Sequence, residues 1–387
     1  MWKSLIFLAL AMFTVGCNIY LIAGLLPQIG QTIGQPVAVA GQGVSIFSLA
    51  YLCSAPVFSV VFANKPAKGI IQLALTLFII GNLVTMFSEN VALFLIGRSI
   101  AGVGAGIFTP LCIGIAMHLV DESAKGRVLS FVWGANSAGV VFGVPLGLYL
   151  ASMYHWKFAI GLIVASSLVS LIGFSLQKAD IKMPESPSIA DRLRPLVDPK
   201  TLAVIGVSCF TAMASLGLFS YVTLLQSGSP HSLSLTLFCW GLGGFVGSSV
   251  IGFFIDKSRK PRLVMSAILL GLMLTILSIP FAKNIPFLGL VPFFLWGMFG
   301  WATATPQQKI LFELHETQGT ILAALNSSAF GLGSAIGTAI GGLIISSGFK
   351  EANLPFPAAA LLLAVLIGQL VIMNNSELNN SKKVCST

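Results

Sequence analysis

The chain has 387 residues, of which 56% are hydrophobic and 9% are charged, and its formal net charge is +9. Soluble domains average about 25% charged residues, so the composition excludes a soluble globular protein. The six cysteines show neither a pairing pattern nor metal-ligand spacing, which predicts no disulfide framework and no metal site. An integral membrane protein is expected.

Apolar stretches of about 20 residues, long enough to cross a bilayer, recur along the whole chain. The first is expected to stay in the protein rather than be cleaved as a signal peptide, because only Lys3 precedes it and no clear cleavage site follows. Twelve spans are predicted, at residues 4–25, 40–62, 70–88, 91–117, 129–151, 158–176, 200–224, 234–255, 263–282, 286–306, 319–347 and 356–374.

The basic residues are distributed unevenly between the two sides that these spans define. An even number of spans places both termini on one side, and about 17 of the 21 lysines and arginines fall there. Only Lys157, Lys283 and Lys350 fall on the other side. Because cytoplasmic loops carry the excess of basic residues, both termini are predicted to be cytoplasmic.

Glycines at four-residue spacing mark the fifth span. Gly139, Gly143 and Gly147 follow Asn136, and Pro145 lies between the last two glycines. Glycine and proline are poor helix formers in water, but in lipid a span stays helical and small residues let a neighbouring helix approach. The pattern predicts a membrane helix with one glycine face, packed at an interface between two parts of the protein.

An internal repeat predicts those two parts. Asn136, Gly143 and Gly147 recur 190 residues later as Asn326, Gly333 and Gly337, and the loop at 62–68 recurs at 254–260. A proline-rich and charged stretch separates the copies. The predicted domains are a six-helix bundle at 1–176, a cytoplasmic linker at 177–200, a second six-helix bundle at 201–375 and a cytoplasmic tail at 376–387. Parallel repeats of this kind place a substrate site near the midplane between the halves.

Arg98 is the one basic residue inside a predicted span. Burying such a charge costs about 2.5–3.5 kcal/mol even on insertion scales, so Arg98 needs a role. One interpretation is that it faces the central cavity and holds a substrate oxygen, an anion or a water network. The alternative is a structural arginine that bonds backbone carbonyls between helices.

Uncharged polar and aromatic residues in the spans complete the candidate substrate site. Amides and a phenol can hydrogen-bond a sugar, a base or a polyol, and an indole can stack on a ring. For the aromatic residues, core packing or lipid contact is the alternative. The candidates beside Arg98 are Asn18, Asn136, Tyr221, Trp301, Gln307 and Asn326.

All twelve carboxylates are predicted to lie in loops or tails, and the histidines lie at span ends. A proton-coupled transporter usually needs a proton-exchanging group within its cavity, so no carrier is evident. A cavity that holds Arg98 without a carboxylate favours a neutral or anionic substrate over a permanent cation.

With these residues in place, the chain resembles the major facilitator superfamily, and within it the twelve-helix drug:proton antiporters that include arabinose-efflux-like permeases and purine base or nucleoside efflux pumps. The resemblance covers nearly the whole chain. It rests on Gly139-Val-Val-Phe-Gly143-Val-Pro145-Leu-Gly147, on Arg98 followed by Gly102, Gly104 and Gly106, on Leu26-Pro27, and on a cytoplasmic loop with Gly252, Asp256, Lys257, Arg259, Lys260 and Arg262. Tyr221, Gln307 and Asn326 match the purine-efflux branch.

The resemblance implies an all-α membrane protein with twelve transmembrane helices in two pseudo-symmetric six-helix bundles. It also implies a conformational latch at Asp256, Arg259 and Arg262, for which a solvated turn is the alternative. Two positions depart from the family pattern. Asn64 replaces an aspartate in the first copy of the loop motif, and Asn18 stands where many members carry an acid.

The expected function is export of a small drug-like, nucleoside-like or sugar-like solute across a bacterial inner membrane by alternating access, with protons as a candidate coupling ion. The protein is expected to be a monomer that binds no nucleic acid, cofactor or metal. No phosphate loop, metal-ligand set or activated nucleophile is found, so an enzyme is not expected. The alternatives are a uniporter or importer of a polar metabolite, and a membrane receptor that has lost transport. The receptor hypothesis is disfavoured because no soluble output domain is predicted.

Overall fold

Helices account for nearly all of the chain that the structure describes. The computed structural model describes residues 2–61, 66–119, 125–177, 197–226, 232–258, 261–314 and 319–384. Within these residues, 12 helices are long and apolar enough to cross a membrane, and no strand is present, so the predicted fold class is confirmed.

The helices of the first half begin with α1, which extends well beyond the first predicted span. In chain order they are α1 (Trp2–Ile33), α2 (Val37–Ala40), α3 (Gln42–Val61), α4 (Ala67–Met86), α5 (Val91–His118), α6 (Lys125–Ala138), the π-helical turn η2 (Gly139–Gly143), α7 (Val144–Met153) and α8 (Trp156–Ser175).

The second half follows the same plan with more interruptions. Its elements are α10 (Pro199–Phe219), α11 (Val222–Leu225), α12 (Leu233–Ser258), α13 (Pro261–Ala282), the 3₁₀ turn η4 (Leu288–Leu290), α14 (Val291–Ala302), α15 (Ala304–Leu314), α16 (Gly319–Ser346), the 3₁₀ turn η6 (Glu351–Asn353) and α17 (Pro355–Val384).

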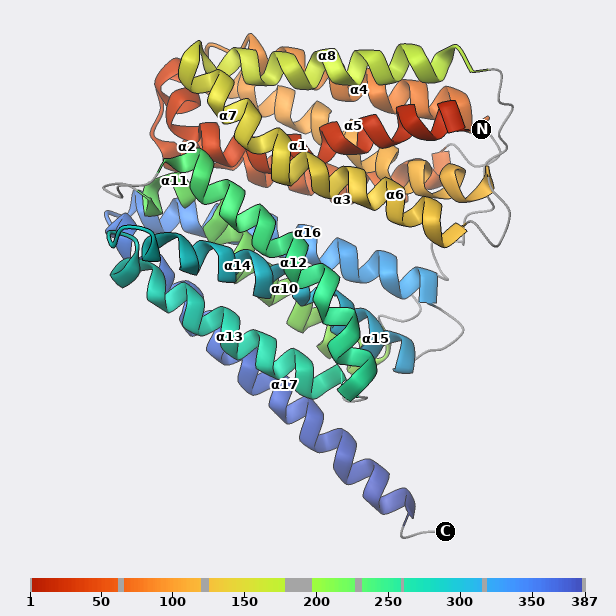
Figure 1. The fold of residues 1–387 in the computed structure, drawn as a ribbon, viewed down its shortest axis with the longest axis vertical. Coiled ribbons are helices and arrows are strands. Elements are labelled where there is room, and N and C mark those ends of the chain that lie inside the picture. The colour runs from red at the N-terminus through yellow and green to blue at the C-terminus, as the bar shows by residue number, and fades with distance from the viewer. Residues whose placement is uncertain are drawn as a thin grey trace.

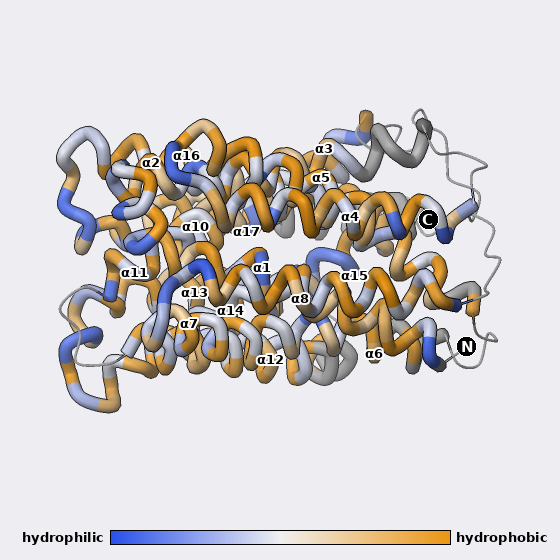
Figure 2. Tube along the Cα trace, turned by 90° about the horizontal axis from the view of Figure 1, so that it is seen from above, coloured by the Kyte–Doolittle hydropathy of each residue, from blue (hydrophilic) through white to orange (hydrophobic). Residues whose placement is uncertain are grey.

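The two halves lie side by side, and α1 begins at the same end of the molecule at which α17 finishes (Figure 1). Apolar residues run along the helices, while hydrophilic ones gather in the connections at the end opposite the termini (Figure 2). Between the halves, α16 packs against α2 and α3, α12 packs against η2 and α7, and α1 packs against α11. These packed pairs form what we call the seam.

Side-chain caps begin several of the helices. Asn90 accepts a hydrogen bond from the Leu93 amide at the start of α5, and Asp198 accepts from the amides of Lys200 and Thr201 at the start of α10. Such caps satisfy amides that have no partner within the helix, so they fix where each span begins.

Two further elements differ from the predicted boundaries. The tenth predicted span consists of α14 and α15, which break at Thr303 and continue to Leu314, so Glu313 lies at the end of this span rather than in a loop, with an exposed side chain. The helix α17 continues to Val384, past the start of the predicted tail.

Glycines also allow α12 and α14 to cross with their backbones in contact. A Cβ atom added at Gly243 would overlap the carbonyl oxygen of Phe294, and one added at Gly297 would overlap that of Trp240. A Cβ added at Gly247, one turn after Gly243, would likewise overlap the carbonyl oxygen of Met298. Small residues at four-residue spacing permit this approach in membrane helices.

Candidate functional site

Arg98 lies inside the first half, with none of its surface exposed. It projects from α5 towards α3 and α1. Its Nε donates to the carbonyl oxygen of Gly43 at 3.3 Å, its Nη1 donates to Asn18 Oδ1 at 3.1 Å, and its guanidinium carbon lies 4.3 Å from the centre of the Phe47 ring. All three of these partners are uncharged. A guanidinium that faces a carbonyl, an amide and a ring keeps its full positive charge available for an anionic group.

A relay of amides continues from Arg98 into α4. Asn18 Nδ2 donates to Asn82 Oδ1 at 2.5 Å, and Asn82 Nδ2 donates to the carbonyl oxygen of Phe78 at 2.8 Å. Both asparagines are fully buried. Asn18 therefore uses its oxygen for Arg98 and its nitrogen for Asn82, which fixes the orientation of its amide.

One nitrogen of Arg98 remains without a protein partner. Nη2 is buried and has no hydrogen-bond partner in the described part of the chain. An unpaired buried donor is costly, and more so when it is charged, so a group that accepts from Nη2 gains a strong hydrogen bond. The structure thus places an open donor next to a fixed amide pair.

Gln307 and Asn326, two polar candidates of the second half, form hydrogen bonds to α10. Gln307 Nε2 donates to the carbonyl oxygen of Val204 at 3.2 Å, while its Oε1 is buried and has no partner among the described residues. Asn326 Oδ1 accepts from Ser208 Oγ at 2.6 Å. Val204 and Ser208 are one turn apart, so both amides contact one side of α10.

An aromatic cluster bridges the seam. We define it as Tyr20 of α1, Phe219 of α10, Trp240 of α12, and Trp296 and Trp301 of α14. The ring centre of Tyr20 lies 5.2 Å from that of Trp240, 5.5 Å from Phe219 and 6.2 Å from Trp301. Tyr20 and Trp301 are half-buried, whereas Trp240 is buried and its Nε1 has no partner in the part of the chain that the structure describes.

Within the second half the cluster is tightly held. The rings of Phe219 and Trp240 lie 4.1 Å apart, those of Trp240 and Trp301 lie 5.6 Å apart edge to face, and Trp296 Nε1 donates to Ser215 Oγ at 2.8 Å. Ring pairs in these arrangements contribute about 0.5–1.5 kcal/mol each. Tyr20 is the member from the first half, so separating the halves at this point breaks its contacts alone.

Tyr221 occupies a notch at the end of the seam opposite the termini. It is fully buried, and its hydroxyl donates to the carbonyl oxygen of Thr338 at 2.7 Å. A Cβ added at Gly41 of the first half would lie 2.7 Å from this hydroxyl, and one added at Gly342 of α16 would lie 2.8 Å from it. The tyrosine therefore closes the seam at this end.

We expect the Gly41→Ala substitution to loosen this closure. The added methyl group collides with the Tyr221 hydroxyl, so the closed seam loses stability. A loss of about 1 kcal/mol from the closed state would raise the population of the state with an open seam about fivefold. Leu237 is buried against Gly24 across the seam, so a cysteine at this position reacts with a maleimide only when the seam opens. The labelling rate of Leu237→Cys, in a chain whose native cysteines are replaced, therefore measures the open population.

Gly206→Ala provides the matched control, since a Cβ at Gly206 meets nothing within 4 Å. The labelling rate should stay unchanged in that variant. Equal rates in the two alanine variants would show that Tyr221 does not close the seam.

The glycine face of the fifth span packs against the first helix of its own half. A Cβ at Gly139 would overlap the carbonyl oxygen of Phe13, one at Gly143 would touch Cys17, and one at Gly147 would touch Leu21. This corrects the expectation that the glycines face the seam. Their neighbour Val141 makes that contact instead, against Gly241 of α12.

Pro145 follows a π-helical turn. The Val144 amide bonds to the carbonyl of Gly139, five residues earlier, and Pro145 lies at the start of α7. Proline has no amide hydrogen, so it is best placed at the beginning of a helical segment. Asn136, one turn before the π turn, donates from Nδ2 to the carbonyl oxygen of Met12 at 3.3 Å and therefore anchors α6 to α1.

The predicted latch lies only partly within the described residues. Arg259 lies outside them, and Asp256 is described only as part of α12, without its side chain. Arg262 lies at the start of α13, and its Nε is buried without a partner among the described residues. The latch remains a prediction.

The family model of the Major Facilitator Superfamily matches residues 8–338. The chain belongs to the major facilitator superfamily. That assignment agrees with the 12 spans found in the described residues and with the packing of the two halves.

Relatives within the superfamily match along nearly their whole length. The chain is 27% identical to the MFS-type transporter YbcL of Bacillus subtilis, over 97% of this chain and 96% of YbcL. It is 24% identical to the inner membrane transport protein YdhP of Escherichia coli, over 92% of each. It is 25% identical to the purine ribonucleoside efflux pump NepI of Shigella sonnei, over 92% of this chain and 91% of NepI.

The predicted site residues form separate groups in this member of the superfamily. Asn18 joins Arg98, whereas Gln307 and Asn326 contact α10 and Trp301 belongs to the aromatic cluster. Asn18 and Tyr20 are two residues apart on α1 and thus face roughly opposite sides. One side of α1 carries the arginine group and the other side meets the second half.

Asn82 and Tyr20 were not among the sequence candidates. Asn82 is an amide in an apolar span, and the cost of such a group without a partner was a usable signal. Tyr20 carried no such signal, because a half-buried aromatic residue in a span is also typical of lipid contact.

Proposed function

We propose that this superfamily member exports a small, neutral or anionic, ring-bearing organic solute across a bacterial inner membrane by alternating access, with both termini in the cytoplasm. The observation that carries the proposal is the aromatic cluster. It joins the halves through one residue, Tyr20, which is the kind of contact that two rocking bodies can make and break.

The closed contacts support a state that faces the cytoplasm. Tyr20 meets the aromatic cluster, Gly24 lies against Leu237, and Tyr221 lies against Gly41. Gly24, Leu237, Gly41 and Tyr221 lie in the part of their helices farthest from the termini, and Tyr20 lies just past the middle of α1. A transporter closed there receives solute from the side on which its termini lie.

The half-buried rings supply the chemistry for a planar solute. Tyr20 and Trp301 each present part of a ring, and Trp240 Nε1 is a buried donor without a partner among the described residues. Stacking on such rings does not require a charge on the solute. The similarity to a pump named for purine ribonucleosides is consistent with a planar ring.

Solute flux into proteoliposomes tests the proposal. A thermal-shift panel of nucleosides, sugars, phenicols and organic anions selects the solute, and flux is then measured in vesicles of known protein orientation. We expect Trp301→Ala to weaken the binding of ring-bearing solutes about tenfold, since 1.4 kcal/mol corresponds to that factor. Trp133→Ala, at a 45% exposed position on α6, should leave affinity unchanged.

Two outcomes would contradict parts of the proposal, and a third concerns proton coupling. No binding and no flux across the panel would favour the non-transporting receptor. Flux only towards the side of the termini would make the protein an importer. Flux without any solute-driven pH change in the vesicles would make it a uniporter instead of a proton antiporter.

A further inference from the structure

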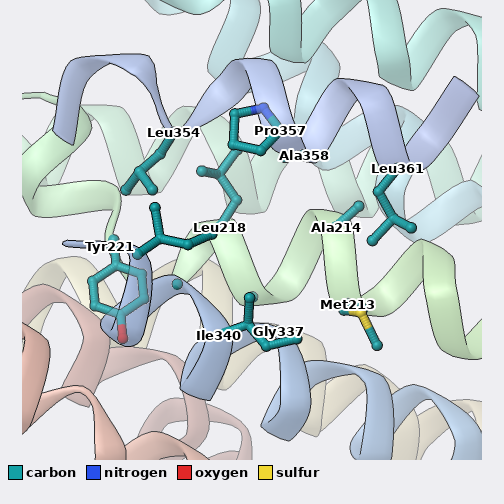
Figure 3. Close-up of a pocket in the computed structure, with 13 residues that line it drawn as sticks. Met213, Ala214, Leu218, Tyr221, Gly337, Ile340, Leu354, Pro357, Ala358 and Leu361 are labelled. Carbon is teal, nitrogen blue, oxygen red and sulfur yellow. The ribbon is translucent and has the colours of Figure 1, made fainter. Parts of the chain in front are cut away.

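An apolar groove runs along α10 in the second half, on the side of α10 that α17 covers. The helix α10 packs against both α16 and α17, and these two helices form the walls of the groove (Figure 3). Met213 and Gly217 of α10 lie on its floor, Ile340 belongs to the α16 wall, and Ala358 and Leu361 belong to the α17 wall. Its volume is about 150 Å³.

Small residues create this groove. A Cβ at Gly217 would lie 2.6 Å from the backbone of Gly337, so α10 and α16 touch directly and no side chain fills the corner between them. At Gly341 of α16 the Tyr221 ring takes the place of a side chain, because an added Cβ would lie 2.7 Å from it, and the small side chain of Ala358 keeps the α17 wall low.

The groove is long rather than round. Met213 and Tyr221 both line it and are eight residues apart, which corresponds to about 12 Å along a helix. It begins near Leu354, just before α17, and therefore occupies the half of the membrane farthest from the termini. A narrow groove of this kind fits an extended hydrocarbon chain better than a ring-shaped molecule.

Its surroundings indicate what fills it. Ile340 on its rim is 43% exposed, and Leu343 and Phe356 on the walling helices are 69% and 41% exposed, as expected for side chains that face lipid. An apolar cavity of this size stays free of water and takes an apolar guest of about six carbons. The bilayer supplies such a guest directly.

Lys350 favours a phospholipid as that guest. It is exposed and lies four residues before Leu354, at the level where α17 enters the membrane. A lysine beside the mouth of an acyl-chain groove can attract the phosphate of a headgroup.

We propose that an acyl chain of a phospholipid, from the leaflet opposite the termini, occupies this groove and packs against the ring of Tyr221. The chain fills a void that would otherwise leave its lining without van der Waals partners. Because Tyr221 also closes the seam, the bound chain supports the tyrosine from the lipid side. Lipid binding here does not depend on which solute is transported.

Photolabelling tests this proposal. The intact protein is reconstituted in vesicles containing a phosphatidylglycerol that carries a diazirine in one acyl chain, and labelled peptides are identified by mass spectrometry. Labelling should concentrate on the lining residues 213–221, 337–344 and 354–361, several-fold above the exposed face of α8. Ala358→Trp fills the groove and should remove this excess.

Ala360→Trp is the matched control, because Ala360 lies on the same helix but is exposed and does not line the groove. If Ala358→Trp does not fold, Ala358→Leu replaces it. Equal labelling in the variants at 358 and 360, or no excess over α8, would overturn the proposal. Neither result depends on measuring transport, so failure here is distinguishable from failure of the proposed function.

Discussion

Solute flux is expected to fall at least tenfold in the Arg98→Met protein, while the amount of folded protein stays nearly the same. Methionine removes the charge and the donors to Gly43 and Asn18 but keeps an unbranched side chain of similar length. We expect Nη2 of Arg98, which lacks a partner within the described ranges, to donate a hydrogen bond to the solute. Because such a charge-assisted bond contributes about 1.5–3 kcal/mol, its loss exceeds a factor of ten.

Folding should change little because two effects oppose each other. The oxygens of Gly43 and Asn18 each lose a donor, which destabilises the fold by about 1–3 kcal/mol each. Removing the buried charge stabilises the fold by about 2.5–3.5 kcal/mol. The melting temperature in detergent and the flux in vesicles, measured on one preparation, separate folding from function.

Arg98→Lys provides the companion variant. Lysine keeps the charge but is a single point donor, so it cannot reach both Gly43 and Asn18 with the geometry of a guanidinium. We expect intermediate flux. Full flux in the methionine variant would show that Arg98 serves packing alone.

The second large effect is expected at the crossing of α12 and α14. Gly297→Val places methyl groups where the Trp240 carbonyl lies, and a backbone cannot move aside as a side chain does. Overpacking of a side-chain core costs about 1–3 kcal/mol, and a backbone clash exceeds that range. The yield of monodisperse protein, followed by size-exclusion chromatography, should fall about tenfold or more.

Gly331→Val and Gly368→Val are the controls for this prediction. A Cβ at either position meets nothing within 4 Å, yet both lie in membrane helices and carry the same change in helix propensity. They should express like the unchanged protein. A normal yield of the valine variant at 297 would mean that the two helices can separate without loss.

Hydropathy was sufficient to predict the number of spans and the general position of each, because a bilayer requires long apolar helices wherever the chain crosses it. The buried arginine was also predictable, since one charge in an apolar span stands out. The direction in which the Arg98 side chain points could not be predicted. The hydrogen bonds of Asn18 to Asn82 on α4 and to Arg98 on α5 show that the side of α1 with Asn18 faces into the first half.

The crossing of α12 and α14 and the role of Tyr20 could not be derived from the sequence for a different reason. Glycines are so common in this chain, 40 in all, that Gly243 and Gly297 carried no distinguishing pattern. Tyr20 gains its meaning from Phe219, Trp240 and Trp301, which are about 200 residues or more away in sequence. Such pairings depend on how the halves meet.

The π turn at Gly139–Gly143 changes how the two parts of this span are oriented. A turn that bonds five residues back holds one more residue than an α-helical turn, so it shifts the angular phase of α7 relative to α6 by about 100°. A single helical wheel drawn over 125–153 would therefore assign α6 and α7 to a common face that they do not share. Deleting one residue from the turn would rotate α7 relative to α12 and α8, so this span should tolerate substitutions better than changes of length.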